Sequence, residues 1–290
     1  MTTEASKPKT DSFLKVPASI LLTGKILQFL SLKLAARFAA RLFITPIKFS
    51  VPKRELKMDA ESKQTFLKLP KSEKEICVYE YGDSVRKILL VHGWSGRGTQ
   101  LVKIAEKLLE KGYATVSFDA PAHGKASGKS SDLIQFIEAV LFLEKKYGPF
   151  EAAVGHSLGG MTILNAMAKG LALSKVVLIG SGDIVTDIMD DFIANIQLKP
   201  KVRYLMQAIF EKKTQELMND YSASKAAKMV EAPVLIIHDE DDLEVPVKCA
   251  YHIQQNLKNA EIFITSGLGH RKILGNGTVV AKTINHIIKN

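Results

Sequence analysis

A glycine-flanked serine between a strand-like run and a helix-like run constrains the fold of this chain most. Residues 155–159 read Gly-His-Ser-Leu-Gly, after an apolar run that ends at Val154 and before a helix-like stretch at 162–169. A turn this sharp strains the backbone of the serine, and a side chain at either glycine would collide with the neighbouring strand or helix. The pattern predicts a strand–turn–helix unit that exposes the Ser157 hydroxyl. Taken alone, these five residues fit a glycine-rich turn with an incidental serine equally well.

The rest of the chain from residue 65 onward alternates strand-like and helix-like stretches. Alternation of this length predicts a mostly parallel central sheet with helices on both faces, which is an α/β fold. The strand-like runs are 65–69, 76–81, 87–92, 114–118, 152–154, 175–179, 234–238 and 261–265. The helix-like runs outside the serine turn are 100–111, 133–147, 247–257 and 279–288.

Residues 183–231 interrupt this alternation. They contain no clear strand but are rich in helix formers at 188–196, 201–210 and 223–230. An insertion of about fifty residues is long for a loop and should carry its own helices. Because it joins two strand ends on the side of the serine, we expect a small helical cap there. The expected organisation is an extension over 1–60 and a domain over 61–290.

The positive charge of the chain is concentrated near its start. The net charge is +10, and residues 1–75 hold 15 Lys or Arg against 7 Asp or Glu, whereas the remainder holds 25 against 23. No interleaving of basic and aromatic residues accompanies this charge, so we expect no nucleic-acid partner.

Residues 13–50 are apolar but interrupted by basic side chains. Lys25 lies in the middle of the best apolar window, which argues against a membrane-spanning helix, and no cleavable signal pattern is evident. Lys33, Arg37 and Arg41 recur every four residues, opposite an apolar face, and so predict an amphipathic helix. This helix is expected either to lie on an anionic membrane or to pack on the folded body. Residues 53–63 are expected to form a polar connector.

The two cysteines indicate a reducing compartment. Cys77 and Cys249 lie far apart in apolar stretches, as separate buried thiols would, so we expect a cytoplasmic protein. Association of that protein with a membrane is left open. No cysteine and histidine cluster has zinc-ligand spacing, and residues 93–98 lack the Lys-Ser/Thr of a phosphate loop. Neither a metal nor a cofactor is expected.

Four further motifs accompany the serine turn. They are His92-Gly93-Trp94, Phe118-Asp-Ala-Pro-Ala-His-Gly124, the acidic loop from His238 to Pro246, and Gly267-Leu-Gly-His270. Together and in this order, they resemble the α/β-hydrolase family over roughly residues 65–290. The resemblance implies the α/β-hydrolase fold. The helical cap and the amphipathic N-terminal extension described above are expected in addition to that fold.

The resemblance also implies a serine-based reaction centre. Ser157 matches the nucleophile, His270 the general base and Asp242 the acid that orients it. Two more carboxylates of the same loop, Asp241 and the more distant Asp239, are the alternatives for the acid, but both are expected to be solvated turn residues.

Further residues complete the implied site. The backbone N–H groups of Trp94 and Leu158 match the oxyanion donors, and the side chains of Trp94 and His156 are expected to line the substrate site. The implied activity is hydrolysis of a carboxylic ester through an acyl-enzyme, with a small-molecule acyl ester as the substrate. The alternatives are a thioesterase, an aminopeptidase or a non-catalytic membrane-associated binding module.

Overall fold

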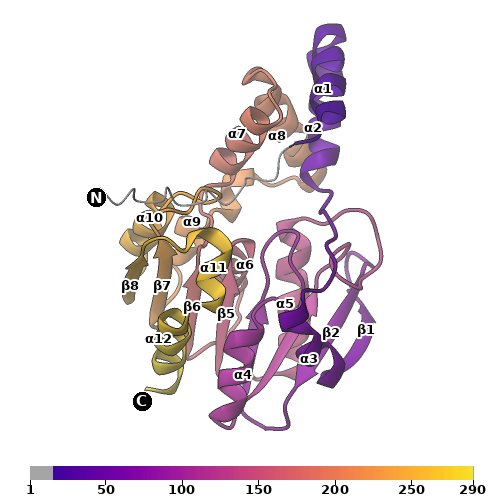
Figure 1. Ribbon diagram of the computed structural model, residues 1–290. Helices are drawn as coiled ribbons and strands as arrows, with labels where there is room; N and C mark the ends of the chain where they lie inside the picture. Colours follow the sequence, from indigo (N-terminus) through magenta and orange to yellow (C-terminus); the bar gives the residue numbers. More distant parts are fainter. Residues whose placement is uncertain (1–15, 290) are drawn as a thin grey trace, which may run out of the picture.

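A single eight-stranded sheet forms the centre of the molecule in the computed structural model, which describes residues 16–289 (Figure 1). The strand order is β1-β2-β4-β3-β5-β6-β7-β8; β1 and β2 are antiparallel to their neighbours, and the others run parallel. The predicted mostly parallel sheet is therefore confirmed. The strands are β1 (Lys63–Lys68), β2 (Glu75–Tyr81), β3 (Lys87–Val91), β4 (Ala114–Asp119), β5 (Ala152–His156), β6 (Lys175–Ile179), β7 (Val234–Asp239) and β8 (Ala260–Thr265).

Helices cover both faces of the sheet, as the alternation predicts (Figure 1). Strand β3 shows why its sequence is apolar throughout, because Leu89 and Val91 face one core and Ile88 and Leu90 face the other. The first core includes α5 (Leu133–Tyr147), α6 (Leu158–Ala168), α9 (Ala223–Ala227) and α10 (Lys248–Asn256). The second includes α4 (Val102–Glu110) and α12 (Gly277–Ile288).

The segment predicted as a polar connector at 53–63 is largely helical. The segment folds into the short helix η1 (Lys53–Glu55) and α3 (Leu56–Glu61). Glu55 is only 1% exposed and accepts hydrogen bonds from Arg97 Nη1 at 3.1 Å and Thr99 Oγ1 at 2.9 Å. A buried carboxylate needs such partners, so Glu55 anchors the segment, whereas most of its other polar side chains are exposed.

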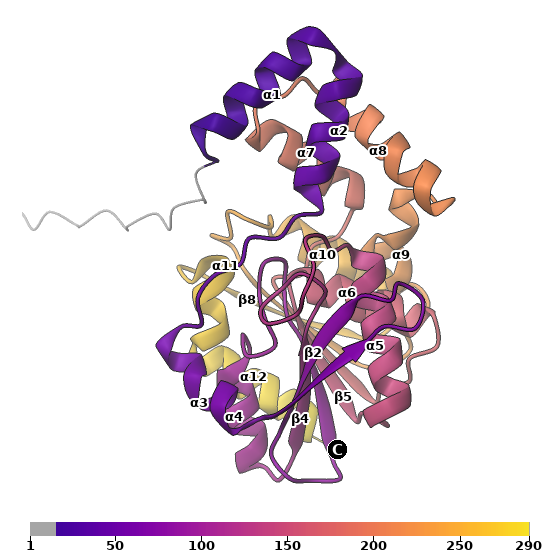
Figure 2. The ribbon, with the colours of Figure 1, turned by 90° about the vertical axis from the view of Figure 1, so that its right-hand side faces the viewer.

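Four helices stand beyond the carboxyl ends of the strands and form what we call the helical layer (Figures 1 and 2). They are α1 (Ala18–Leu30) and α2 (Leu32–Phe43) of the extension, and α7 (Val185–Asn195) and α8 (Lys201–Thr214) of the cap. The short helices η2 (Met218–Tyr221), α11 (Gly269–Lys272) and η3 (Ile273–Gly275) complete the described chain.

One apolar cluster holds the helical layer together. Ala35 and Ala39 of α2 are fully buried in the same cluster as Met189 of α7 and Met206 of α8. Small side chains on α2 let the backbones approach, so the apolar face that the sequence indicates packs on the cap. Residues 1–15 of the predicted extension lie outside the described residues.

Candidate active site

The predicted strand–turn–helix unit around the serine is present between β5 and α6. Ser157 has φ 53° and ψ −118°, a conformation that residues with a side chain rarely adopt. A Cβ on Gly155 would lie 2.5 Å from the carbonyl oxygen of Gly159, and a Cβ on Gly159 would lie 2.2 Å from that of Val91. Both glycines are therefore required by close backbone packing around the strained serine.

His270 and Asp242 form a buried pair. His270 lies in α11 after β8, and its Nδ1 is 2.7 Å from Oδ2 of Asp242, which follows β7. Since a carboxylate can only accept, Nδ1 carries the proton. The other oxygen of Asp242 accepts the N–H groups of Glu244 and Val245, each at 2.8 Å. These bonds fix the carboxylate, which in turn fixes the imidazole orientation and directs the proton to Nδ1.

The end of β6 contacts both Ser157 and the His270–Asp242 pair. The Ser157 N–H donates to the carbonyl oxygen of Ile179 at 2.9 Å. At the next residue, Gly180, a Cβ would lie 3.3 Å from His270 Nδ1 and 3.5 Å from Asp242 Oδ2. Because Gly180 has no side chain, the pair can pack directly against the end of β6, whose Ile179 accepts the Ser157 N–H. This role of Gly180 was not predicted from the sequence.

Backbone donors flank Ser157. Leu158 is the first residue of α6, where an N–H has no intrahelical partner and the helix dipole favours negative charge. The turn after β3 lies against the serine, because a Cβ on Gly93 would be 2.9 Å from Ser157 Cβ. The Gly93 N–H is engaged by Gln100 Oε1 at 3.1 Å, and the next N–H of the turn is that of Trp94, the residue that the resemblance matches to an oxyanion donor.

His156 is placed differently from the sequence prediction. Its ring is only 1% exposed, lies 4.6 Å from the ring of His270, and donates from Nε2 to the His270 carbonyl oxygen at 2.9 Å. Burial lowers the pKa of His156, so the ring is neutral. We therefore assign His156 a positioning role, holding the backbone of His270, in place of the predicted substrate contact.

Two other buried histidines brace the same region. His92 donates from Nδ1 to the Gly93 carbonyl oxygen at 2.7 Å and accepts the Ala120 N–H at 3.1 Å, which ties the Trp94 turn to the end of β4. His238 donates from Nε2 to the carbonyl oxygen of Val245 at 2.8 Å and so closes the loop that carries Asp242. Burial lowers the pKa of both rings.

The prediction that Asp239 is solvated is wrong. It is fully buried and accepts hydrogen bonds from Thr265 Oγ1 at 2.7 Å, Gly269 N at 2.9 Å, and Leu268 N and Asp241 N at 3.1 Å. Burial alone raises the pKa of Asp239, but these donors outweigh it and hold the pKa below its ordinary value. Asp239 therefore shapes the loop that leads into His270, whereas Asp241 is exposed as predicted.

Asp239→Asn is expected to lower the free energy of unfolding by about 2 kcal/mol, because an amide group would direct N–H donors at N–H donors. Asp241→Asn, at an exposed carboxylate two residues away, is the matched control and should change it by less than about 0.5 kcal/mol. Urea unfolding at neutral pH measures both. Equal effects would contradict the placement of Asp239.

An aromatic wall adjoins the Trp94 turn. The half-buried Trp94 ring meets His123 edge-on with centroids 5.1 Å apart, and His123 also contacts His92 at 5.0 Å and Phe136 at 5.3 Å. His123 donates from Nδ1 to the Pro121 carbonyl oxygen at 3.0 Å. Burial lowers the pKa of His123 to about 4, so this wall is uncharged near neutral pH.

Stability should fall as the pH drops from 6.5 towards 4. In this window the unfolded chain binds a proton at residue 123 that the folded chain does not, which costs up to about 3 kcal/mol. His123→Phe keeps an aromatic ring but removes the titration, so its free energy of unfolding should depend less on pH. Urea unfolding at pH 7.5, 6.0 and 5.0 tests this. An unchanged pH dependence in the variant would contradict it.

Asp119 is a further residue of the site region that the sequence analysis did not single out. Its buried carboxylate accepts Tyr79 Oη at 2.8 Å and the N–H groups of Gly98 and Lys125, each at 2.7 Å. A Cβ on Gly124 would lie 2.2 Å from this carboxylate. Asp119 thus braces the loops that carry Trp94 and His123, and the Phe118–Gly124 motif was its only signal.

Among residues 16–289, no group of three or more His, Cys, Asp or Glu side chains is arranged to hold a metal ion. Cys77 is buried, Cys249 is half-buried, and both are free thiols.

Comparison with known proteins agrees with this architecture. The chain is similar to a bromoperoxidase from Bacillus anthracis (16% identity, 79% of this chain and 100% of that one, TM-score 0.60). It is similar to an esterase from Exiguobacterium antarcticum (16% identity, 78% of this chain and 99% of that one, TM-score 0.61). It is also similar to an esterase from Pyrococcus furiosus (15% identity, 85% of this chain and 96% of that one, TM-score 0.62). At these identities the likeness shows the fold alone.

No curated protein matches the chain. The model of the alpha/beta hydrolase family matches residues 88–277, which is more than half of the chain. This chain therefore belongs to the alpha/beta hydrolase family.

Proposed function

We propose that this protein is a serine hydrolase that cleaves a carboxylic ester through an acyl-enzyme formed on Ser157. The observation that carries the proposal is the buried His270–Asp242 pair packed at Gly180, directly after Ile179, whose carbonyl oxygen accepts the N–H of the strained Ser157. Two of the similar structures are esterases, which favours this chemistry.

Each group has a defined task in the proposed reaction. With its Nδ1 proton bound to Asp242, neutral His270 has a lone pair on Nε2 that can take the Ser157 proton as the hydroxyl attacks the ester carbonyl. The N–H groups of Leu158 and Trp94 stabilise the oxyanion of the tetrahedral intermediate. His270 then returns the proton to the leaving alcohol. Water repeats the sequence on the acyl-enzyme and releases the carboxylic acid.

The same groups can attack thioesters and amides, so thioesterase and aminopeptidase activities are the alternatives. A non-catalytic binding module is a further one. We favour the ester over the amide because an alcohol is a better leaving group than an amine, and two of the similar structures are esterases. We propose no nucleic-acid partner and no cofactor.

A substrate panel tests the proposal. Acyl p-nitrophenyl esters of two to twelve carbons, acyl-CoA thioesters and aminoacyl p-nitroanilides are compared by kcat/KM. The esters are expected to give the highest value at some chain length. Turnover of only the thioesters or only the anilides would replace the substrate class, and turnover of none would contradict the proposal.

A further inference from the structure

The outward face of helix α1 is apolar and uncovered. Leu22, Ile26, Phe29 and Leu30 each expose more than half of their surface, and their spacing places them on one side of the helix. A surface helix of a globular protein normally directs polar side chains outward. Within residues 16–289, nothing covers this face.

The opposite face fixes α1 in place. Gly24 is buried, and a Cβ there would lie 3.2 Å from the Leu198 side chain, so α1 packs closely on the loop between α7 and α8. The Lys199 N–H donates to Gln28 Oε1 at 2.6 Å. The exposed apolar face is therefore held at the outer end of the helical layer, far from the sheet (Figures 1 and 2).

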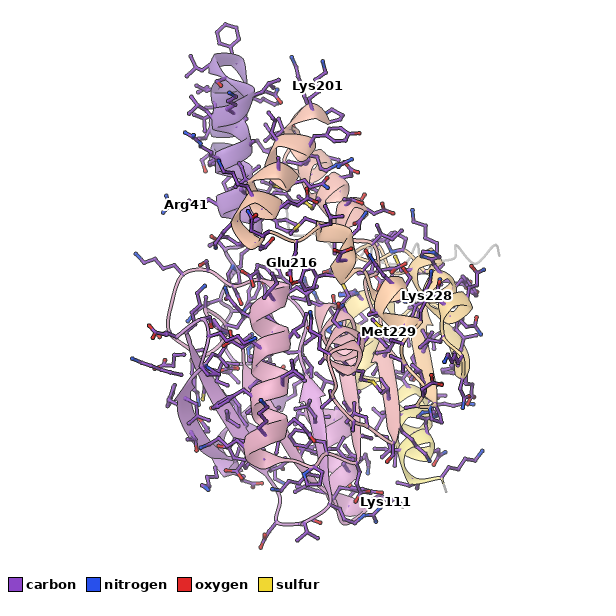
Figure 3. The ribbon with its side chains drawn as sticks, turned by 180° about the vertical axis from the view of Figure 1, so that it is seen from behind. Arg41, Lys111, Lys201, Glu216, Lys228 and Met229 are labelled. Atoms are coloured by element: carbon purple, nitrogen blue, oxygen red, sulfur yellow. The ribbon has the colours of Figure 1, made fainter. Side chains whose placement is uncertain are left out.

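The surroundings of this face are positively charged. Residues 16–54 contain seven Lys or Arg and no acidic residue. In the cap, Arg203 is paired with Asp190 at 2.9 Å, which leaves Lys199 and Lys201 as the cations next to α1. Lys25, Lys33, Lys199 and Lys201 are exposed on the elements around α1. Figure 3 shows Lys201 at the outer end of the layer and Lys111 at the opposite end of the molecule. Docking of a second copy here would bring two positive ends together, which opposes self-association.

We propose that the outer face of α1 inserts into the surface of an anionic membrane, with the neighbouring lysines at the lipid phosphates. An apolar helix face bordered by cations suits the boundary between headgroups and acyl chains. This differs from the sequence expectation, because the apolar face of α2 is already used against the cap. No helix among residues 16–289 is long and apolar enough to cross a membrane.

Resting on the proposed function, this orientation points to acyl esters dissolved in lipid as the substrate class. The helical layer lies beyond the carboxyl ends of the strands, on the side that carries Ser157 and His270 (Figure 1). A membrane against α1 would therefore face the same end of the molecule as the proposed reaction centre.

Vesicle sedimentation of the full-length chain tests the proposal. The protein is expected to sediment with vesicles of equal parts phosphatidylglycerol and phosphatidylcholine at 0.1 M NaCl, and less with pure phosphatidylcholine or at 1 M NaCl. Phe29→Ser, at a residue 91% exposed, should weaken the apparent affinity about tenfold. Val85→Ser, at a residue 93% exposed between β2 and β3, is the matched control and should bind like the wild type.

Two measurements keep the outcomes separate. Thermal melting should show that Phe29→Ser is folded, and Ser157→Ala should bind vesicles like the wild type, so vesicle binding is judged independently of ester hydrolysis. Wild-type protein that remains in the supernatant with anionic vesicles overturns the proposal. So does a wild-type dimer that Phe29→Ser converts to a monomer without any vesicle binding, because a second copy would then cover the face.

Discussion

Ser157→Ala is expected to lower kcat for p-nitrophenyl ester hydrolysis by about 10⁴-fold or more, because no other group in the site can form the acyl-enzyme. The melting temperature should change little, since alanine occupies the same positive-φ position at a similar backbone cost. Steady-state kinetics with saturating ester and a thermal melt measure both.

Two further variants separate the hydroxyl from the turn that presents it. Ser157→Gly should be equally inactive but more stable by about 1 kcal/mol, because glycine adopts φ 53° without strain. Ser127→Ala, at an exposed serine outside the turn, should keep wild-type activity. Substantial activity in Ser157→Ala would contradict the role of the residue.

Asp242→Asn is expected to lower kcat about 10³- to 10⁴-fold while the fold is kept. The amide oxygen can still accept the N–H groups of Glu244 and Val245, but the amide nitrogen would donate to His270 Nδ1. This shifts the imidazole proton to Nε2, where it blocks acceptance of the serine proton.

Asp241→Asn provides the control for this substitution. Asp241 is next to Asp242 in the same loop, but its carboxylate is exposed. This carboxylate accepts hydrogen bonds from Ser266 Oγ at 3.1 Å and Gly267 N at 2.8 Å, and none from His270 is seen in the described part of the chain. It should stay within about threefold of the wild-type rate, as surface substitutions usually do. If Asp241→Asn lost more activity than Asp242→Asn, the assignment of the acid would be wrong.

The strands and helices could be predicted because the burial of each one determines the pattern of apolar residues within its own sequence. Strand β6 is buried on both faces, so its residues form a continuous apolar run that ends where the strand ends. Helix α5 begins where predicted, since the side chain of Asp132 accepts the N–H of Gln135 as an N-cap and an apolar stripe follows. Such signals lie within a few residues of the element that they define.

Contacts between distant segments could not be predicted in the same way. Asp239 is bonded by a loop about 30 residues further along the chain, so the residues next to Asp239 do not indicate that it is buried. The apolar face of α2 indicates burial but not its partner, which is the cap about 150 residues away. The division of the extension into two helices at Ser31 was also not predicted. The Ser31 hydroxyl accepts the Lys33 N–H as the N-cap of α2.

Mass spectrometry of the wild-type chain after reaction with a fluorophosphonate, which modifies only an activated serine, tests whether Ser157 is the nucleophile. A single adduct is expected on the peptide that contains Ser157, absent in Ser157→Ala and strongly slowed in Asp242→Asn. An unmodified Ser157, or an adduct on another serine that Ser157→Ala leaves in place, would contradict it.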